Sequence, residues 1–175
     1  IAAVTIIVLG LIAPKALPSV WITVLSMAFY YAILTIGWNI IFGYTGLFSY
    51  GHAAFPVIGG YTSALLAQHI GLSPFLGLLA GALVAGLSGI LIGLLILRVR
   101  GFYLCLVTWA FAEAVNVIIT AEHQITGGTG GLLAPTFSSG PNAELFGYFI
   151  GLGLMMFAFL ISILLYHSRW GLNLF

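Results

Sequence analysis

Six apolar runs alternate with short polar or glycine-rich breaks along the 175 residues of the chain. The runs cover residues 1–13, 20–42, 53–67, 74–97, 102–120 and 145–166. An α-helix needs about 20 apolar residues to cross the hydrocarbon of a bilayer, so four of these runs predict membrane-spanning helices. The first run looks cut short at the N-terminus. The third follows a glycine-rich stretch, which predicts a helix that begins within the membrane thickness.

Composition places the chain among membrane proteins. Hydrophobic residues make up 62% of it and charged residues 4%, whereas a typical soluble domain has about 45–50% apolar and about 25% charged residues. The formal net charge of +1 argues against nucleic acid as a partner. The pattern therefore predicts an all-α, polytopic transmembrane helix bundle that contacts the lipid bilayer.

Basic residues set the expected orientation of the helices. Arg98 and Arg100 follow the fourth run and Arg169 follows the sixth. Because arginines in short loops mark the cytoplasmic side of a membrane protein, we expect six crossings with both ends of the chain in the cytoplasm.

A broken helix is predicted in residues 39–61, which read NIIFGYTGLFSYGHAAFPVIGGY. Its glycines, Gly43, Gly46 and Gly51, are expected to interrupt the helix, and polar side chains lie between and beside them. Irregular backbone at membrane depth is tolerated only where protein buries it or where it lines a water-filled path. Broken helices often form transport sites. A plain cytoplasmic loop before a helix start is the alternative.

Glu113 lies near the middle of the fifth apolar run, residues 102–120. A carboxylate at that depth is costly unless it faces protein, water or a partner, so we expect it to face the interior of the bundle. Its carboxyl group is expected to be either neutral or paired with a cation on another helix. Since no cation is apparent nearby in the sequence, the neutral or hydrogen-bonded form is favoured.

Glycines in the fourth run favour close helix packing. Gly77, Gly81, Gly89 and Gly93 fall four or eight residues apart, which places them on nearly one helical face where a neighbouring backbone can approach. We therefore expect these residues to support the bundle and not to contact a substrate. A second glycine-rich stretch, ITGGTGGL at residues 125–132, lies in the longest predicted loop, where a turn without function is the alternative to a functional motif.

Three ordered motifs resemble one known family. They are GYTGLFSYGHAAF at residues 43–55, LRVRGFYLCLVTWAFAE at residues 97–113 and ITGGTGGL at residues 125–132. In this order and spacing they resemble the permease subunit of branched-chain amino acid ABC importers of the leucine/isoleucine/valine type. Leu47 stands where that family usually has Gln, and Asn116 stands where many members have Arg.

The resemblance implies a set of functional residues. The implied external loop motif comprises Thr126, Gly127 and Gly128, and neither catalytic residues nor metal ligands are implied. The implied substrate path comprises Asn39, Tyr44, Thr45, Ser49, Gly51, His52 and Glu113.

The resemblance also implies an architecture and partners. Residues 1–175 would form a single transmembrane permease domain, about six helices of a ten-helix permease, that stops before the cytoplasmic loop with the coupling helix. The implied partners are a second permease subunit, identical or homologous, two cytoplasmic ATPase subunits and an extracytoplasmic substrate-binding protein. The location would be the plasma (inner) membrane of a bacterium or archaeon. The substrate stays open between branched-chain amino acids, other amino acids, urea and short amides.

The chain is expected to be a transport subunit and not an enzyme. It has no GxxxxGK[ST] phosphate-binding motif, so we expect it to bind no cofactor while ATP is hydrolysed by the partner subunits. A passive channel for a small polar solute is one alternative. An intramembrane serine protease built on Ser49 and His52 is another, although neither residue lies in a Gly-x-Ser-Gly turn.

Overall fold

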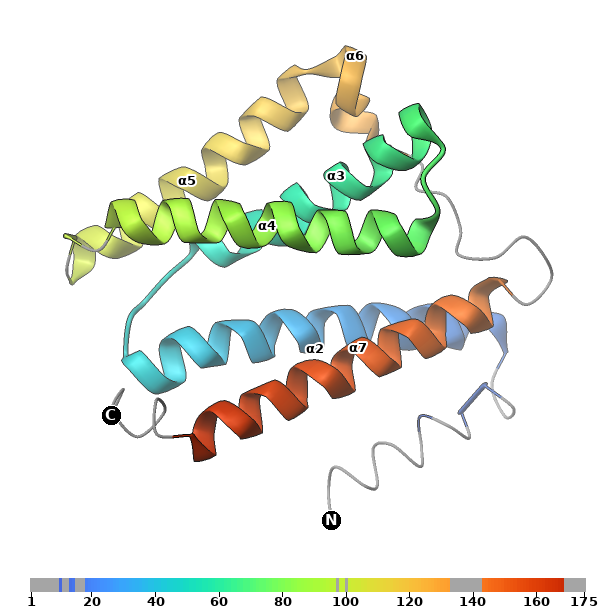
Figure 1. The fold of residues 1–175 in the computed structure, drawn as a ribbon, viewed down its shortest axis with the longest axis horizontal. Helices are drawn as coiled ribbons and strands as arrows, with labels where there is room; N and C mark the ends of the chain where they lie inside the picture. Colours follow the sequence, from blue (N-terminus) through green and yellow to red (C-terminus); the bar gives the residue numbers. More distant parts are fainter. Residues whose placement is uncertain are drawn as a thin grey trace. The chain divides into compact units, whose positions relative to one another are not determined.

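The computed structural model describes residues 10, 13–14, 18–96, 98–99, 101–132 and 143–168, and for Tyr44 and Thr45 the backbone alone. Helices make up nearly all of this part of the chain, which contains no β-strand. The helices, shown in Figure 1, are α2 (Ser19–Thr45), η1 (Gly51–Ala53), α3 (Ala54–Ile70), α4 (Pro74–Ile96), α5 (Phe102–Ala121), α6 (His123–Thr126), η2 (Gly128–Gly130) and α7 (Ala143–His167). The prediction of an all-α bundle is confirmed.

The long helices match the apolar runs closely. Four of them, α2, α4, α5 and α7, are long and apolar enough to cross a membrane. Their ends differ from the predicted ones by at most three residues. The third run forms α3, a helix of 17 residues that follows directly on the 3-10 turn η1. The first run, residues 1–13, lies almost wholly outside the described residues.

The chain divides into two compact units, each of which is described here by itself. One comprises Ile1–Gly37 with Thr136–Phe175, and the other comprises Trp38–Pro135. Helix α2 continues from the first unit into the second, because the division falls between Gly37 and Trp38.

In the first unit the start of α2 packs against α7. The core of this contact contains Ile22, Phe29, Tyr148 and Leu152. The Tyr148 side chain is fully buried, and its ring centroid lies 5.1 Å from that of Phe29. Its hydroxyl donates a hydrogen bond of 2.8 Å to the carbonyl of Gly10. Burial of this phenol is therefore accompanied by a satisfied hydrogen bond, as a polar group in an apolar core requires.

In the second unit α3 and α4 form a tight helical hairpin, seen as two adjacent helices in Figure 1. A Cβ atom at Gly81 would overlap the carbonyl oxygen of Gly59, and one at Gly77 would lie 2.7 Å from the Ser63 hydroxyl. Small residues at the crossing thus let the two backbones approach closely. The predicted packing role is confirmed for Gly77 and Gly81.

The other two glycines of α4 lie in more open surroundings. Among the described residues, an added Cβ at Gly89 would contact only the ring of Phe55, and one at Gly93 would have no neighbour within 4 Å. Both line a cavity described below. The packing role expected of Gly89 and Gly93 stays a prediction.

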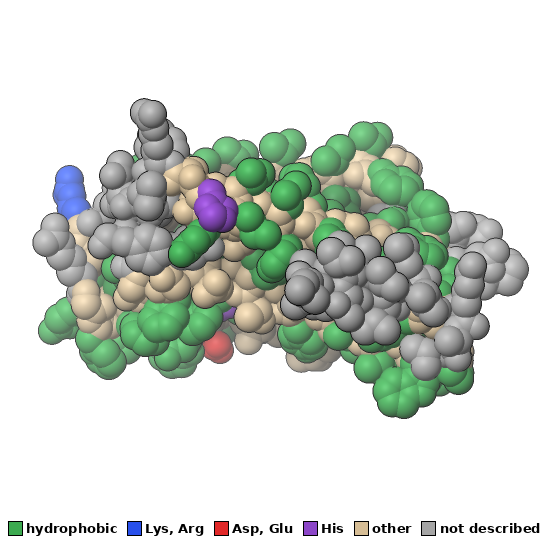
Figure 2. Space-filling model, turned by 90° about the horizontal axis from the view of Figure 1, so that it is seen from below, with side chains coloured by type: hydrophobic (Ala, Val, Ile, Leu, Met, Phe, Trp, Pro, Cys, Tyr) green, Lys and Arg blue, Asp and Glu red, His purple; other side chains and the backbone are tan. Residues whose placement is uncertain are grey.

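The membrane helices bury little of their apolar surface within the chain. Buried residues make up 6% of the most apolar stretch of α4 and 11% of that of α5. Figure 2 shows hydrophobic side chains spread over the visible face, with very few charged ones. Such a surface is suited to contact with lipid or with further apolar helices.

Candidate functional site

The predicted break between helices lies at residues 46–50, after the end of α2. Helix α2 continues through Gly43 to Thr45, so the expectation that Gly43 interrupts the helix was wrong. Gly46 has a φ of 66°, a left-handed conformation that favours glycine, and its N–H donates to the carbonyl of Phe42. The helix therefore ends at Thr45, directly before Gly46, and regular structure resumes at Gly51.

Side chains from two helices satisfy the backbone of this broken segment. The Cys105 thiol of α5 donates to the carbonyl of Phe48 at 3.4 Å. The Trp38 indole of α2 donates to the carbonyl of Ser49 at 3.3 Å. Irregular backbone at membrane depth needs partners of this kind, since hydrocarbon offers none.

Thr108 provides the third and most buried of these contacts. Its hydroxyl accepts a hydrogen bond of 3.1 Å from the Tyr50 N–H and donates to the carbonyl of Leu104 at 2.9 Å. The Thr108 side chain is 2% exposed. Gly51 packs directly on this residue, because an added Cβ there would lie 3.1 Å from the Thr108 carbonyl oxygen. Thr108 and Gly51 thus join the Cys105 hydrogen bond in fixing the broken segment to α5.

A cavity of about 530 Å³ borders the broken segment. Its walls come from the end of α2, the broken segment, the start of α3, the C-terminal part of α4 and the N-terminal part of α5. Most of the lining is aliphatic or aromatic, and Ser49 and Thr108 provide the hydroxyl groups. Apolar walls with a few polar groups are the usual composition of a small-molecule site.

The predicted path residues of residues 39–61 are only partly brought together. Ser49 and Gly51 line the cavity. Asn39 is exposed on α2, where its side chain lies beside Gly43. The side chains of Tyr44 and Thr45 lie outside the described residues.

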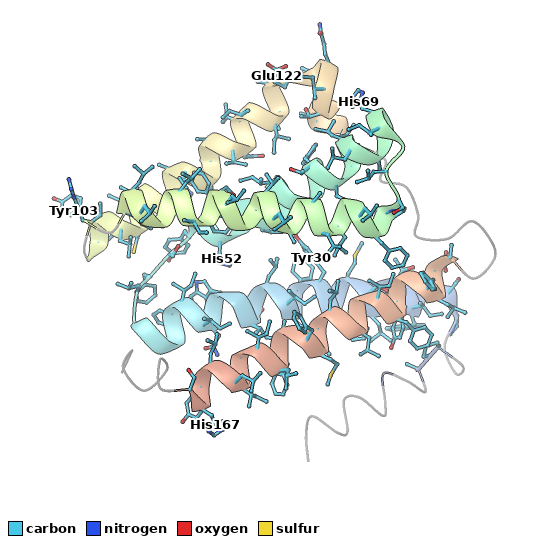
Figure 3. The ribbon with its side chains drawn as sticks, viewed as in Figure 1. Tyr30, His52, His69, Tyr103, Glu122 and His167 are labelled. Carbon is cyan, nitrogen blue, oxygen red and sulfur yellow. The ribbon has the colours of Figure 1, made fainter. Side chains whose placement is uncertain are left out.

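His52 lies in η1, at the start of the α3 segment (Figure 3). Its ring centroid is 6.4 Å from that of Trp38. Its Nδ1 atom is buried and has no hydrogen-bond partner among the described residues. This nitrogen therefore does not pair with the Ser49 hydroxyl, as a serine–histidine dyad through Nδ1 would require.

Glu113 does not share the cavity. Its side chain is exposed on α5, whereas the cavity is lined by Thr108 and Phe111 of the same helix. Within its own unit Glu113 is not packed, and the expectation that it faces the interior of the bundle stays a prediction. The sequence did not predict this exposure, because Glu113 has apolar neighbours on both sides and these do not show which face of α5 packs within the unit.

The predicted external motif forms a tight structural turn after α5. The Thr126 hydroxyl lies within hydrogen-bond distance of the carbonyls of Ile119 and Glu122 and accepts from the Gly128 N–H. Gly128 has a φ of 57°, and a Cβ there would overlap the His123 ring. These contacts cap the end of α5. Figure 3 labels Glu122 at this end of the helix and Tyr103 at the opposite end.

Sequence reasoning assigned no role to three side chains that fix the broken segment, namely Trp38, Cys105 and Thr108. Thr108 and Cys105 belong to the second motif and lie three residues apart, on one face of a helix. The sequence feature that could have identified them is a pair of small hydrogen-bonding side chains in an otherwise apolar run. Their target on a distant segment could not be read from that feature.

Several apolar helices of membrane-spanning length, one of them ending in a broken segment, define a multi-pass helical membrane protein. Residues 20–175 match the family model described as branched-chain amino acid transport system / permease component. The chain belongs to this permease family.

Two curated relatives agree with the family match. The high-affinity branched-chain amino acid transport system permease protein LivM of Escherichia coli (strain K12) is 35% identical over 144 residues, which cover 82% of this chain and 33% of the relative. LivM of Salmonella typhimurium (strain LT2) is 37% identical over 126 residues, 72% of this chain and 28% of the relative. The chain thus spans about a third of the length of these relatives. No solved structure matches it.

Proposed function

We propose that this chain is part of the permease subunit of an ATP-driven importer for branched-chain or related amino acids, and that it provides part of the translocation path. The family match over residues 20–175 carries the proposal. The fixed broken segment and its cavity support it, since broken helices at membrane depth commonly form transport sites. The chain is a transport subunit and not an enzyme.

The proposal includes a complex. A second permease subunit, two cytoplasmic ATPase subunits and an extracytoplasmic binding protein would complete the importer in the plasma membrane of a bacterium or archaeon. ATP would be hydrolysed by the ATPase subunits, and the permease would alternate between two arrangements that the partners bind differently.

Uptake measurements test this proposal. The full-length permease with its partner subunits is expressed in cells that lack their own leucine importers, and uptake of radiolabelled leucine is followed. We expect saturable uptake that isoleucine and valine inhibit and that disappears when the ATPase subunits are made inactive. Uptake that persists without ATP hydrolysis would indicate a passive channel. Inhibition by urea in place of isoleucine would refute the substrate class.

A further inference from the structure

Helix α5 has two faces of different character. One face packs within its unit and includes the buried residues Leu104 and Thr108. The other face is exposed among the described residues of this unit and bears a row of polar or amphipathic side chains. Their spacing of four, three and four residues places them within about 60° of one another around the helix, at 100° per residue. They are Trp109, Glu113, Asn116 and Thr120.

This row lies away from the packed face and the cavity. Trp109, Glu113 and Asn116 are exposed, and Thr120 is partly exposed. The centre of the row is about 130° around the helix from the packed face, at 100° per residue. We call residues 109, 113, 116 and 120 the polar face of α5.

Lipid is a poor neighbour for this face. Helix α5 is long and apolar enough to span a membrane, and Glu113 is close to its middle. Ionisable side chains at such depth face protein or water, because hydrocarbon solvates neither a carboxylate nor an amide.

A paired helix also fits the polar face poorly. Of the lysines and arginines, the structure describes Arg98 alone, and it precedes α5. Glu113 is 11 residues beyond the helix start at Phe102, about 16 Å along the axis at 1.5 Å per residue. A second copy packed on this face about a two-fold axis would bring two Glu113 carboxylates together, which is unfavourable.

The length of the polar face indicates water. From Trp109 to Thr120 it extends over 11 residues, about 16 Å of helix at 1.5 Å per residue. A single hydrogen bond between two helices needs polar groups at one level only. A hydrated path needs polar groups along its whole wall, as the polar linings of selective pores show.

We infer that the polar face of α5 lines the aqueous part of the translocation path and that Glu113 attracts the ammonium group of the amino acid that passes. In water the carboxyl group would be ionised, in place of the neutral form that the sequence favoured. The inference rests on the proposed function, which supplies a zwitterionic solute. The charges are complementary, since the ammonium group is a cation and the described part of the chain offers the carboxylate no nearby lysine or arginine. The cavity at the broken segment then lies on another side of α5 from the water.

Cysteine accessibility tests the aqueous wall in the full-length importer in membranes. Cys105 is retained and its own reaction is measured in the unsubstituted importer. Asn116→Cys is then compared with Val117→Cys, an exposed neighbour outside the polar face. A small charged methanethiosulfonate reagent reacts with the thiolate, which forms in water and not in lipid. We expect Asn116→Cys to react about tenfold faster than Val117→Cys, and leucine to slow that reaction severalfold. Equal rates at the two positions would overturn the inference.

Substitution of Glu113 tests the ammonium interaction. Glu113→Gln retains the shape and removes the charge, so we expect leucine uptake to fall about tenfold with the amount of assembled complex unchanged. Glu113→Asp retains the charge and is expected to keep more uptake than Glu113→Gln. Unchanged uptake in Glu113→Gln, or a parallel loss of assembled complex, would overturn the inference. Absence of uptake in the unmodified importer would instead refute the proposed function.

Discussion

The backbone N–H of Tyr50 donates a hydrogen bond of 3.1 Å to the Thr108 hydroxyl, across 58 residues of sequence. This contact joins the broken segment to the buried face of α5. The same hydroxyl donates to the carbonyl of Leu104 one helical turn earlier. The Thr108 hydroxyl therefore acts both as an acceptor and as a donor.

Thr108→Val should destabilise the permease. Valine has nearly the same shape but leaves the partly buried Tyr50 N–H without this acceptor, and loss of a typical hydrogen bond costs about 0.5–1.5 kcal/mol. We expect a lower unfolding temperature of the purified complex and reduced uptake. Thr108→Ser retains the hydroxyl and serves as the control. Equal stability of the valine and serine variants would show that the contact contributes nothing.

Gly51→Val should abolish transport while some assembled complex remains. An added Cβ would already lie 3.1 Å from the Thr108 carbonyl oxygen, so the broken segment has to move away from α5. Gly60→Val is the matched control, because no described residue lies within 4 Å of a Cβ at Gly60. Leucine uptake and the amount of complex in the membrane are measured for both. Normal uptake by Gly51→Val would mean that the segment is an ordinary loop.

Gly81→Ala should weaken the hairpin of α3 and α4. The new methyl group would overlap the Gly59 carbonyl, and forced overpacking of this kind costs about 1–3 kcal/mol. Gly86→Ala, on the same helix, meets nothing within 4 Å in the part of the chain that the structure describes, and it is expected to be neutral or slightly stabilising. Thermal unfolding of the two purified variants gives the comparison. A Gly81→Ala complex as stable as Gly86→Ala would contradict the close crossing.

Gly128→Ala should lower stability without a specific effect on transport. The positive φ and the nearby His123 ring both oppose a side chain there, and strained backbone costs about 1–3 kcal/mol. Gly130→Ala is the control, because a Cβ at Gly130 would have no neighbour within 4 Å among the residues described. Uptake is divided by the amount of assembled complex, and we expect equal values for both variants. Lower uptake per assembled complex for Gly128→Ala than for Gly130→Ala would show that this turn has a function in transport.

Part of the candidate site was predictable from the sequence. The motif in residues 39–61 predicted a broken segment, and Ser49 and Gly51 do line the cavity beside it. The glycines alone were enough to predict the irregular backbone. At membrane depth, such a backbone requires neighbouring groups that satisfy its hydrogen bonds. The three donors and acceptors that do so, on Trp38, Cys105 and Thr108, depend on which helix lies next to the segment.

The sequence by itself determined the helices. Their ends follow from where runs of apolar residues give way to glycine, proline and charge, a local property that membrane insertion enforces. Only the tertiary structure decided which face of each helix is packed. Gly81 contacts α3 while Gly93 lines a cavity, and Glu113 is exposed although its neighbours in sequence are apolar. In a helix that is apolar all round, hydrophobicity has no preferred direction, so facing is set by close packing and hydrogen bonds between segments distant in sequence.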